Sequence, residues 1–300
     1  MQQKLIAVAA LTLALSCVLS AQAQERGAWM WQSPKSAYGS LQVVGNAQAE
    51  ASTLARLKQW NVKTLYISVR GDGVSNTAAV RAWNTKLAKE GITPYLLLST
   101  TEFLLPEGHA QALKAVDEDF TRYNATAKPE ERFAGVAFDL EPHILTTTAT
   151  HPGWKDANPM QRREYLVNLL ELYKQVRAAI GPKALLEASL PVWLAHQSGS
   201  VGWQNSMDRD AWFHAMAATC DRLSLMAFEQ NSAEKVLART QEERKLLGNH
   251  ARIALRANLG AEWVKVSDFW NATHAVEAVV GTGIDIQDVA RLSEDEAAAK

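Results

Sequence analysis

The sequence predicts an α/β protein built as a single (β/α)8 TIM barrel. Short runs rich in β-branched and aromatic residues alternate with longer amphipathic runs, which is typical of a parallel sheet covered by helices. Eight such pairs can be counted along the 300 residues, and no linker rich in Pro, Gly or Ser divides them. One barrel domain is therefore the simplest architecture for a chain of this length.

The hydrophobic pattern places the elements in order. The expected strands are 28–32, 62–70, 93–99, 133–141, 185–190, 222–228, 252–259 and 283–286. The expected helices are 47–60, 76–90, 108–127, 160–180, 208–219, 233–247 and 267–280, with a short last helix from Gln287. In the first helix, Leu54, Leu57 and Trp60 recur at helical spacing. Gly91 and Gly181 stand where the second and fourth helices should end.

The first 23 residues have the form of a signal peptide. Lys4 supplies a positive start, and residues 5–19 are apolar but short for a membrane span. Ala21-Gln22-Ala23 then has the small-x-small form of a cleavage site. We expect cleavage before Gln24, a periplasmic or secreted protein, and a barrel domain over residues 24–300.

The charge balance and the two cysteines exclude several classes of partner. The formal net charge is −1 and there is no basic run, so we expect no nucleic-acid partner and no polybasic lipid contact. No segment after the leader is long and apolar enough to cross a bilayer. Cys17 could instead carry a lipid anchor, although Ala14-Leu15-Ser16 before it fits that signal poorly. Cys220 would be the one thiol left after cleavage, and we expect it to be buried.

The strand expected at 133–141 carries the clearest chemistry. Side chains alternate along a strand, so this segment has an apolar face and a second face of small and acidic residues. The apolar face, suited to packing under helices, consists of Ala134, Val136, Phe138 and Leu140. The second face consists of Gly135, Ala137, Asp139 and Glu141. It should point into the barrel, with both carboxylates at the mouth where such barrels build their active sites.

Two carboxylates on one face of a strand raise each other's pKa in a partly desolvated site. Asp139 and Glu141 are two residues apart, so their backbones lie about 6.5 Å apart at about 3.3 Å per residue. A carboxyl group that stays protonated near neutral pH is the proton donor that a glycosidic oxygen needs. The alternative is a structural role, with the pair bridged to Arg70 or Arg256 at neighbouring strand ends.

The segment 133–141 resembles the strand-four signature F-D-G-x-D-x-D-x-E of glycoside hydrolase family 18, the chitinases and related endoglucosaminidases. The matching residues are Phe133, Gly135, Asp139 and Glu141, while Ala134 and Ala137 stand where the family has aspartates. Met226-Ala227-Phe228-Glu229 resembles the family's strand-six M-x-Y-D, and Leu98-Ser99 falls at the place of its strand-three S-x-G-G. The resemblance covers these short segments in the family's order.

The resemblance implies a carbohydrate substrate and a role for each matching residue. Glu141 would be the general acid, and Asp139 would position the 2-acetamido group that attacks the anomeric carbon in the substrate-assisted route. Three residues depart from the pattern. Phe228 lacks the tyrosine hydroxyl that helps to hold the acetamido oxygen, Glu229 is one methylene longer than aspartate, and Ala137 removes a charge partner of Asp139. A different sugar, or a barrel that binds carbohydrate without hydrolysing it, stays open.

Further side chains are expected around the mouth. Those assigned to substrate binding are Trp31, Arg70, Ser99, Met226, Phe228, Glu229, Arg256 and Asn258. The tryptophans at strand ends or in the following loops, which could stack on sugar rings, are Trp31, Trp154, Trp193 and Trp203. Trp60, Trp212 and Trp270 fall within helices and are expected to pack. The arginines could equally well form structural ion pairs.

A second enzyme hypothesis uses a different pair of carboxylates. Glu141-Pro142 after the fourth strand and Glu262 after the seventh resemble the large retaining-glycosidase clan with its N-E-P motif. Glu141 would then be the acid/base and Glu262 the nucleophile, although Leu140 stands where that motif has asparagine. The sequence has no metal-ligand motif and no phosphate-binding glycine loop, so no metal and no cofactor are expected.

The sequence therefore predicts an exported glycoside hydrolase that cleaves a polysaccharide, with Glu141 as its general acid. The resemblance favours a polysaccharide or oligosaccharide with N-acetylated sugars. The alternatives are a non-hydrolytic carbohydrate-binding barrel and an interaction scaffold with an empty mouth.

Overall fold

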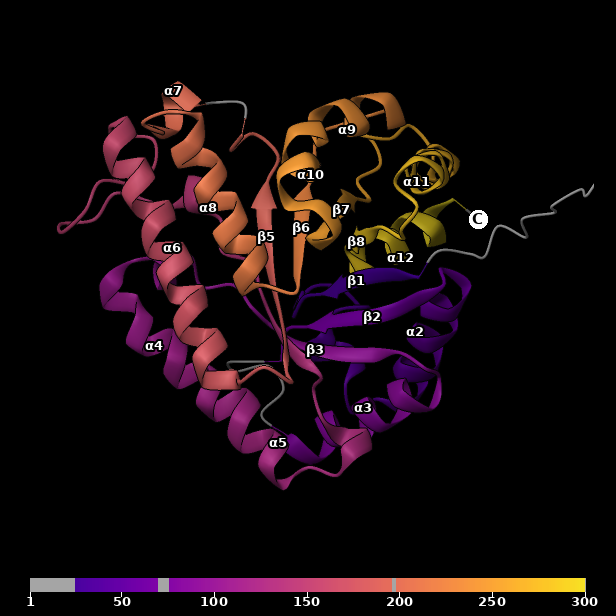
Figure 1. Cartoon of the computed structure of the whole chain (residues 1–300). Coiled ribbons are helices and arrows are strands. Elements are labelled where there is room, and N and C mark those ends of the chain that lie inside the picture. Colours follow the sequence, from indigo (N-terminus) through magenta and orange to yellow (C-terminus); the bar gives the residue numbers. More distant parts are fainter. Residues whose placement is uncertain (1–24, 70–75, 196–197, 300) are drawn as a thin grey trace, which may run out of the picture.

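The computed structural model describes residues 25–69, 76–195 and 198–299, and these form a closed barrel of eight parallel strands (Figure 1). The strands are β1 (Arg26–Met30), β2 (Val62–Ile67), β3 (Thr93–Leu98), β4 (Gly135–Phe138), β5 (Leu185–Pro191), β6 (Arg222–Met226), β7 (Ala251–Arg256) and β8 (Asp285–Gln287). Each strand pairs with the next, and β8 pairs with β1. The predicted single barrel is confirmed. The predicted leader, 1–23 with Cys17, lies outside the described residues.

Helices cover the outside of the barrel. The α-helices are α1 (Ser40–Val43), α2 (Ala47–Gln59), α3 (Thr77–Lys89), α4 (Pro106–Val116), α5 (Tyr123–Thr126), α6 (Pro159–Ile180), α7 (Ser198–Val201), α8 (Ser206–Thr219), α9 (Ala233–Arg239), α10 (Gln241–Leu247), α11 (Val266–Val280) and α12 (Val289–Ala298). The short 3-10 and π turns are η1 (Thr101–Leu104), η2 (Asp117–Arg122), η3 (Pro129–Glu131), η4 (Pro142–Ile144) and η5 (Gly248–His250). In Figure 1, α4, α6 and α8 lie together on one side, and α2 and α3 lie beside β2 and β3.

Side chains of the strands alternate between two apolar cores. The larger core lies between strands and helices and takes Val136, Phe138 and Leu140, with the Phe138 ring edge-on to Tyr173 of α6. A separate inner cluster fills the barrel and consists of Trp29, Tyr66, Tyr95, Leu97, Ala137 and Ala254. The alternation predicted around β4 is therefore present, and the face that carries Ala137 is the face that looks into the barrel.

A polar network fills the barrel near the strand starts. Arg252 donates to both oxygens of Asp285 at 3.0 to 3.2 Å. The Ser224 hydroxyl oxygen lies 2.5 Å from Glu187 Oε1 and 2.8 Å from Asp285 Oδ2. One hydroxyl has one hydrogen, so one of these carboxyl groups must hold a proton to complete the second bond. Burial, followed by the charge of Asp285, raises the pKa of Glu187 to about 7, so Glu187 holds that proton.

A buried ion pair joins β1 to α11, the helix that precedes β8. Arg26 of β1 donates through Nε and one terminal nitrogen to the two oxygens of Glu277 in α11, both at 2.7 Å. Its other terminal nitrogen donates to the Trp60 carbonyl at 2.9 Å. The guanidinium also lies over the Trp270 ring. As predicted, Trp60 and Trp270 therefore act as packing residues.

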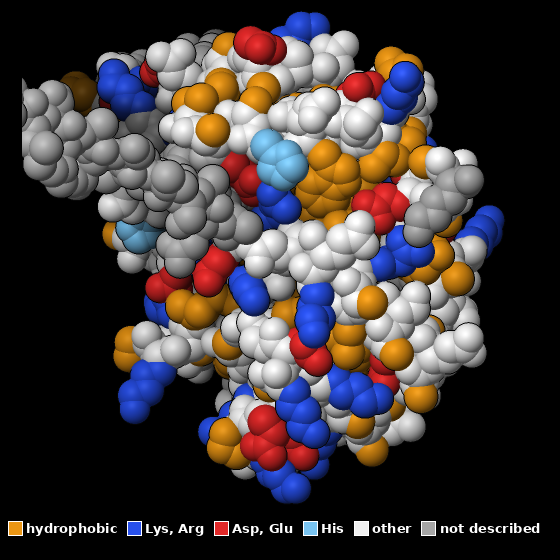
Figure 2. Space-filling model, turned by 90° about the vertical axis from the view of Figure 1, so that its right-hand side faces the viewer, with side chains coloured by type: hydrophobic (Ala, Val, Ile, Leu, Met, Phe, Trp, Pro, Cys, Tyr) orange, Lys and Arg blue, Asp and Glu red, His pale blue; other side chains and the backbone are white. Residues whose placement is uncertain are grey.

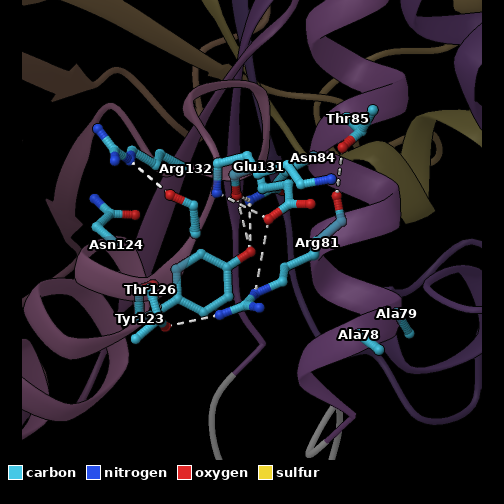
Figure 3. Close-up of polar contacts among 12 residues, drawn as sticks. Ala78, Ala79, Arg81, Asn84, Thr85, Tyr123, Asn124, Thr126, Glu131 and Arg132 are labelled. Carbon is cyan, nitrogen blue, oxygen red and sulfur yellow. Dashed lines mark hydrogen bonds and ion pairs between the residues drawn. The ribbon is translucent and has the colours of Figure 1, made fainter.

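Polar contacts fix the entry into β4, and Figure 3 shows this region between α3 and α5. The Asn124 amide donates to the Phe133 carbonyl at 2.8 Å and accepts from the Phe133 N–H at 3.0 Å. Asn84 and the Tyr123 hydroxyl both donate to the Glu131 carbonyl at 2.9 Å. Gly135 follows, where a Cβ would lie 2.1 Å from the Leu185 carbonyl oxygen. The start of the acid-bearing strand is thus held on both sides.

Some element boundaries differ from the prediction. The strand expected at 133–141 is hydrogen-bonded as β4 only to Phe138, after which the Asp139 N–H bonds to the Leu98 carbonyl at 2.9 Å and the chain turns away. The helix expected at 233–247 is two helices that meet at Thr240, whose backbone has φ −94° and ψ −1° and whose hydroxyl donates to the Val236 carbonyl. The helix expected at 108–127 contains the π turn η2.

The surface carries both signs of charge. On the face shown in Figure 2, Lys and Arg side chains are interspersed with Asp and Glu. Among the described residues, none of the helices is long and apolar enough to span a bilayer. Cys220 is buried, as expected, and burial raises the pKa of its thiol.

Candidate active site

A hollow of about 170 Å³ opens where the chain leaves the ends of β4, β5, β6 and β7. Its walls are formed by Glu141, His143, Pro191, Val192, Trp193, Met226, Phe228, Glu229, Gln230, Arg239 and Arg256. These include five residues assigned to the site from sequence, namely Glu141, Met226, Phe228, Glu229 and Arg256. Segments more than 100 positions apart in the chain therefore meet at one point of the barrel rim.

Asp139 lies buried beside the hollow. Its side chain faces Ser189 across the β4–β5 pair, because Ala137 is in register with Glu187 two residues earlier on each strand. Burial is the first cause that raises the pKa of Asp139 to about 7, and the charge of Glu141 is the second. A hydrogen bond from Ser189 lowers this pKa in part. Oδ1 of Asp139 has no hydrogen-bond partner among the described residues.

Glu141 lines the hollow itself, and 24% of its side chain is exposed. Burial raises the pKa of Glu141, while His143 and Arg256 lower it. His143 Nε2 lies 3.3 Å from Glu141 Oε2. Because the charge of Glu141 raises the pKa of Asp139, these two carboxyl groups titrate as a pair. The group of this pair with a pKa near neutrality is Asp139, and Glu141 is the member that lines the hollow.

Trp193 forms an aromatic wall next to the acid. The His143 ring stands edge-on to Trp193 with centroids 5.6 Å apart, and Trp154 lies behind at 5.4 Å. Trp193 is partly exposed and lines the hollow, so it can stack on a sugar ring. The stacking role predicted for Trp154 and Trp203 is wrong: both are buried, at 7% and 8% exposure, and pack against Trp193 and Trp212 respectively. Trp203 uses its indole N–H on the Leu194 carbonyl.

Arg256 and Glu262 build the opposite wall. Arg256 donates to Glu262 Oε1 through Nε at 2.8 Å and through a terminal nitrogen, and its guanidinium lies over the Phe228 ring at 5.3 Å. The same oxygen of Glu262 accepts the Glu229 N–H at 3.1 Å. Glu229 has a φ of 63°, which is unusual for a residue with a side chain. Glu262 therefore holds Arg256 and the Glu229 backbone in place.

The remaining residues assigned to the site, among those that the structure describes, do not line this hollow, and their assignments stay predictions. Trp31 is half-buried against the inner cluster, and Ser99 is exposed. Asn258 is half-buried, and its carbonyl accepts the Glu262 N–H at 3.0 Å. None of these three described residues lines the 170 Å³ hollow. Arg70 lies outside the described residues, so its assignment stays a prediction.

Arg239 is a residue of the hollow that the sequence did not indicate. It was expected inside one long helix, where a basic side chain is normally solvated. The break at Thr240 instead makes Arg239 the last residue of α9, and its side chain reaches the hollow. Among the described residues its guanidinium has no hydrogen bond or ion pair, so its donors are available to a ligand. Also within these residues, no group of three or more His, Cys, Asp or Glu could hold a metal ion.

No family model matches the chain, and no curated protein matches it. Solved structures do match. The Bacillus cereus spore cortex-lytic enzyme SleL has a TM-score of 0.54 and 8% identity, over 91% of this chain and 74% of that one. The glycoside hydrolase domain of PgaB (BpsB) from Bordetella bronchiseptica has a TM-score of 0.53 and 9% identity, over 92% and 97%. The chitinase RmChi1 from Rhizomucor miehei has a TM-score of 0.53 and 11% identity, over 91% and 99%.

The chain has the fold of the chitinase-like glycoside hydrolases. The resemblance predicted from the segment 133–141 is thus confirmed at the level of the fold. Identities of 8% to 11% carry no residue assignments, so the chemistry of this chitinase-like barrel must be argued from its own side chains.

Proposed function

We propose that this protein is an exported glycoside hydrolase that cleaves a polysaccharide, with Glu141 as its general acid. The observation that carries the proposal is the carboxyl pair of Asp139 and Glu141, in which both pKa values are raised and Glu141 lines a hollow beside Trp193. Glycoside hydrolysis needs such a proton donor next to a second carboxylate. The like-folded SleL, PgaB domain and RmChi1 are a cortex-lytic enzyme, a glycoside hydrolase domain and a chitinase.

In this mechanism the sugar ring stacks on Trp193, and Glu141 gives its proton to the glycosidic oxygen. The carboxylate that Glu141 becomes is stabilised by His143 and Arg256, which both lower its pKa. As the proton reaches the glycosidic oxygen, the bond from that oxygen to the anomeric carbon breaks and the leaving sugar departs as an alcohol. Ionised Asp139 stabilises the positive charge that develops at the anomeric carbon, and water adds there to complete the hydrolysis. Ser189 fixes the direction of Asp139 by donating to it.

N-acetylated sugars are the finer part of the proposal. Asp139 has an unpartnered oxygen, and an acetamido N–H is a donor that could satisfy it. Phe228 stands at the place of the family tyrosine, so the chain has no hydroxyl there for the acetamido oxygen. The Phe228 ring instead packs against the Arg256 guanidinium. Arg239 is a side chain of the hollow that has no hydrogen bond or ion pair among the described residues. We therefore assign the acetamido oxygen to Arg239.

Phe228 also favours a second candidate, a barrel that binds glycans without cleaving them. The hydrophobic ring leaves one hydrogen bond of the substrate-assisted route unmade, which would slow the chemistry more than the binding. The retaining scheme with Glu262 as nucleophile has less support, because Glu262 is engaged by Arg256 and the Glu229 N–H and is 8% exposed. We propose Glu262 as a positioning residue.

A panel of polysaccharides and oligosaccharides tests the hydrolase. Glu141→Gln should lower kcat/KM by about 10²- to 10⁴-fold on any substrate that the wild type cleaves, because the amide cannot donate the proton. Glu102→Gln, a change at an exposed glutamate after β3, is the matched control and should leave the rate unchanged. Equal rates for Glu141→Gln and wild type would disprove the role of Glu141. Tight binding without new reducing ends would establish the glycan-binding barrel instead.

Export is proposed with the hydrolase. Residues 1–23 would be removed before Gln24, unless Cys17 carries a lipid. The intact mass of the protein recovered from the periplasm or medium distinguishes a chain that starts at Gln24 from a lipid-modified one. A full-length cytoplasmic product would contradict export.

A further inference from the structure

We propose that the loop between β4 and α6 forms a second sugar-binding subsite, which holds the continuation of the same glycan chain. The inference rests on the proposed function and deepens it, because it makes the substrate an oligomer that occupies both hollows. The subsite is a hollow of about 530 Å³ lined by loop residues that include Ile144, Thr147 and Lys155.

The sizes of the two hollows support a substrate that occupies both. The hollow at Glu141 has about 170 Å³, whereas pockets that hold small ligands have roughly 300–1,000 Å³. The loop hollow lies within that range, and His143 lines both. A ligand that fills the first hollow and extends past His143 therefore enters the second.

The loop hollow is held open by its own hydrogen bonds. The Thr147 hydroxyl donates to Asp156 and accepts the Gly153 N–H at 2.8 Å, which joins the two sides of the loop. The Trp154 N–H donates to the Leu145 carbonyl at 2.9 Å. Gly153 permits this close approach, because a Cβ there would lie 2.5 Å from the Thr147 nitrogen. A loop that is already ordered by its own hydrogen bonds loses little conformational entropy when a ligand binds.

The same loop is fastened to α6. Arg162 donates from Nε to the Trp154 carbonyl at 2.8 Å and from a terminal nitrogen to the Lys155 carbonyl at 3.2 Å. The Tyr165 hydroxyl donates to the Pro152 carbonyl. Long loops without secondary structure are uncommon in compact domains unless they serve a function. This one is built as a rigid wall next to the acid.

The exposed side chains of the hollow suit a sugar ring. Ile144 is 53% exposed, although large aliphatic side chains are usually buried, and it offers an apolar surface to the C–H face of a pyranose. Lys155 is exposed, and among the described residues its ammonium group has no hydrogen bond or ion pair. It can donate to sugar oxygens at the ring edge.

The shared residue sets the direction of the chain. His143 is 3.3 Å from Glu141 and lines both hollows. The scissile bond at Glu141 therefore has one sugar against Trp193 and the next over His143 and Ile144. The rate then depends on the number of units that the two hollows hold.

A length series tests the subsite. Oligomers of N-acetylglucosamine, glucose and uronic acid with two to six units are incubated with the wild type to measure cleavage. The same oligomers and the monomers are titrated by calorimetry into the Glu141→Gln protein. We expect kcat/KM and affinity to rise with length. Ile144→Ala and Lys155→Met should each reduce the ratio of kcat/KM for the longest to the shortest cleaved oligomer by about tenfold. The matched controls are Val264→Ala, at an 84% exposed valine, and Lys183→Met, at an exposed lysine before β5. They should keep the wild-type ratio.

The outcomes separate this inference from the proposed function. Cleavage that is independent of length, or unaffected by both loop variants, overturns the subsite and leaves the hydrolase standing. Length-dependent binding that both loop variants weaken, without any cleavage, supports the subsite and overturns the hydrolase. Absence of both binding and cleavage across the panel overturns both.

Discussion

The carboxyl groups at the two ends of the barrel have opposite surroundings. At the strand starts, Asp285 is paired with Arg252 and shares the Ser224 hydroxyl with Glu187. The side chains of Asp285, Ser224 and Glu187 are all buried. At the rim, Asp139 receives one bond from Ser189, and Glu141 has His143 at 3.3 Å. No guanidinium or ammonium group of the described residues forms an ion pair with either rim carboxyl.

The difference shows what each proton is for. The proton on Glu187 completes the hydrogen bonds at the Ser224 hydroxyl, deep in the barrel, so it serves the stability of the network. The raised pKa of Asp139 comes from burial and from the charge of Glu141, which lines a hollow. Both places leave one carboxyl oxygen without a partner, Oε2 of Glu187 and Oδ1 of Asp139, so the difference lies in the access that the hollow gives to the rim pair.

The largest effect on stability is expected at the strand starts. Arg252→Met leaves the buried charge of Asp285 without its cation, so the free energy of unfolding should fall by about 3–5 kcal/mol. Urea denaturation measures it. Arg122→Met, which breaks an exposed pair with Asp117, is the control and should change less than about 1 kcal/mol. Equal losses for the two variants would mean that the inner network contributes no more than a surface pair.

Titration of Asp139 at the rim should make the free energy of unfolding depend on pH. The pKa of Asp139 is raised in the folded state to about 7, so its stabilising contribution is complete below the unfolded pKa and is lost as pH rises through 7. Between pH 5 and 8, wild type should lose ~2–3 kcal/mol relative to Asp139→Asn. Denaturation at several pH values measures the difference between the two proteins.

Glu187→Gln sharpens this comparison, because Glu187 also has a pKa of about 7. It should remove a similar pH dependence of stability, whereas only Asp139→Asn should shift the pH profile of kcat/KM. A parallel pH dependence of stability in wild type and Asp139→Asn would contradict the shared proton at the rim.

The smallest effect is expected at Glu229. Its φ of 63° is costly for any residue with a Cβ, so Glu229→Gly should raise the free energy of unfolding by about 1 kcal/mol and keep the N–H that Glu262 accepts. Thermal denaturation measures the change. Lys174→Gly, in the middle of α6, should lower stability by about 1 kcal/mol. A loss at both positions would show that the Glu229 backbone is not strained.

The fold and the acid pair could be predicted because they depend on local patterns. Strand alternation alone assigned Phe138 to the helix side and Ala137 to the barrel interior, and both positions are as expected. The rule that barrel sites lie at strand ends then brought Glu141, Phe228 and Arg256 together, although they are far apart in the sequence.

Other features depend on tertiary contacts that no short window contains. Trp154 and Trp203 follow strands, as a stacking residue would, but whether a loop tryptophan is exposed is decided by what folds over it. Arg239 reaches the hollow as the last residue of α9, next to a junction between two helices that the periodic pattern of 233–247 does not indicate. The pairing of Arg256 with Glu262 likewise requires the turn at Asn258 that brings them together.

The pairing of β1 with β8, together with the bond between Arg26 and Glu277, has a consequence for synthesis of the chain. During synthesis, β1 is made some 250 residues before the segment that pairs with it. Until Asp285 leaves the ribosome, β1 and β7 are open edges that can pair with other chains. A chain truncated before Asp285 should therefore aggregate and lack the function of the rim, even though it contains every residue that lines the hollow.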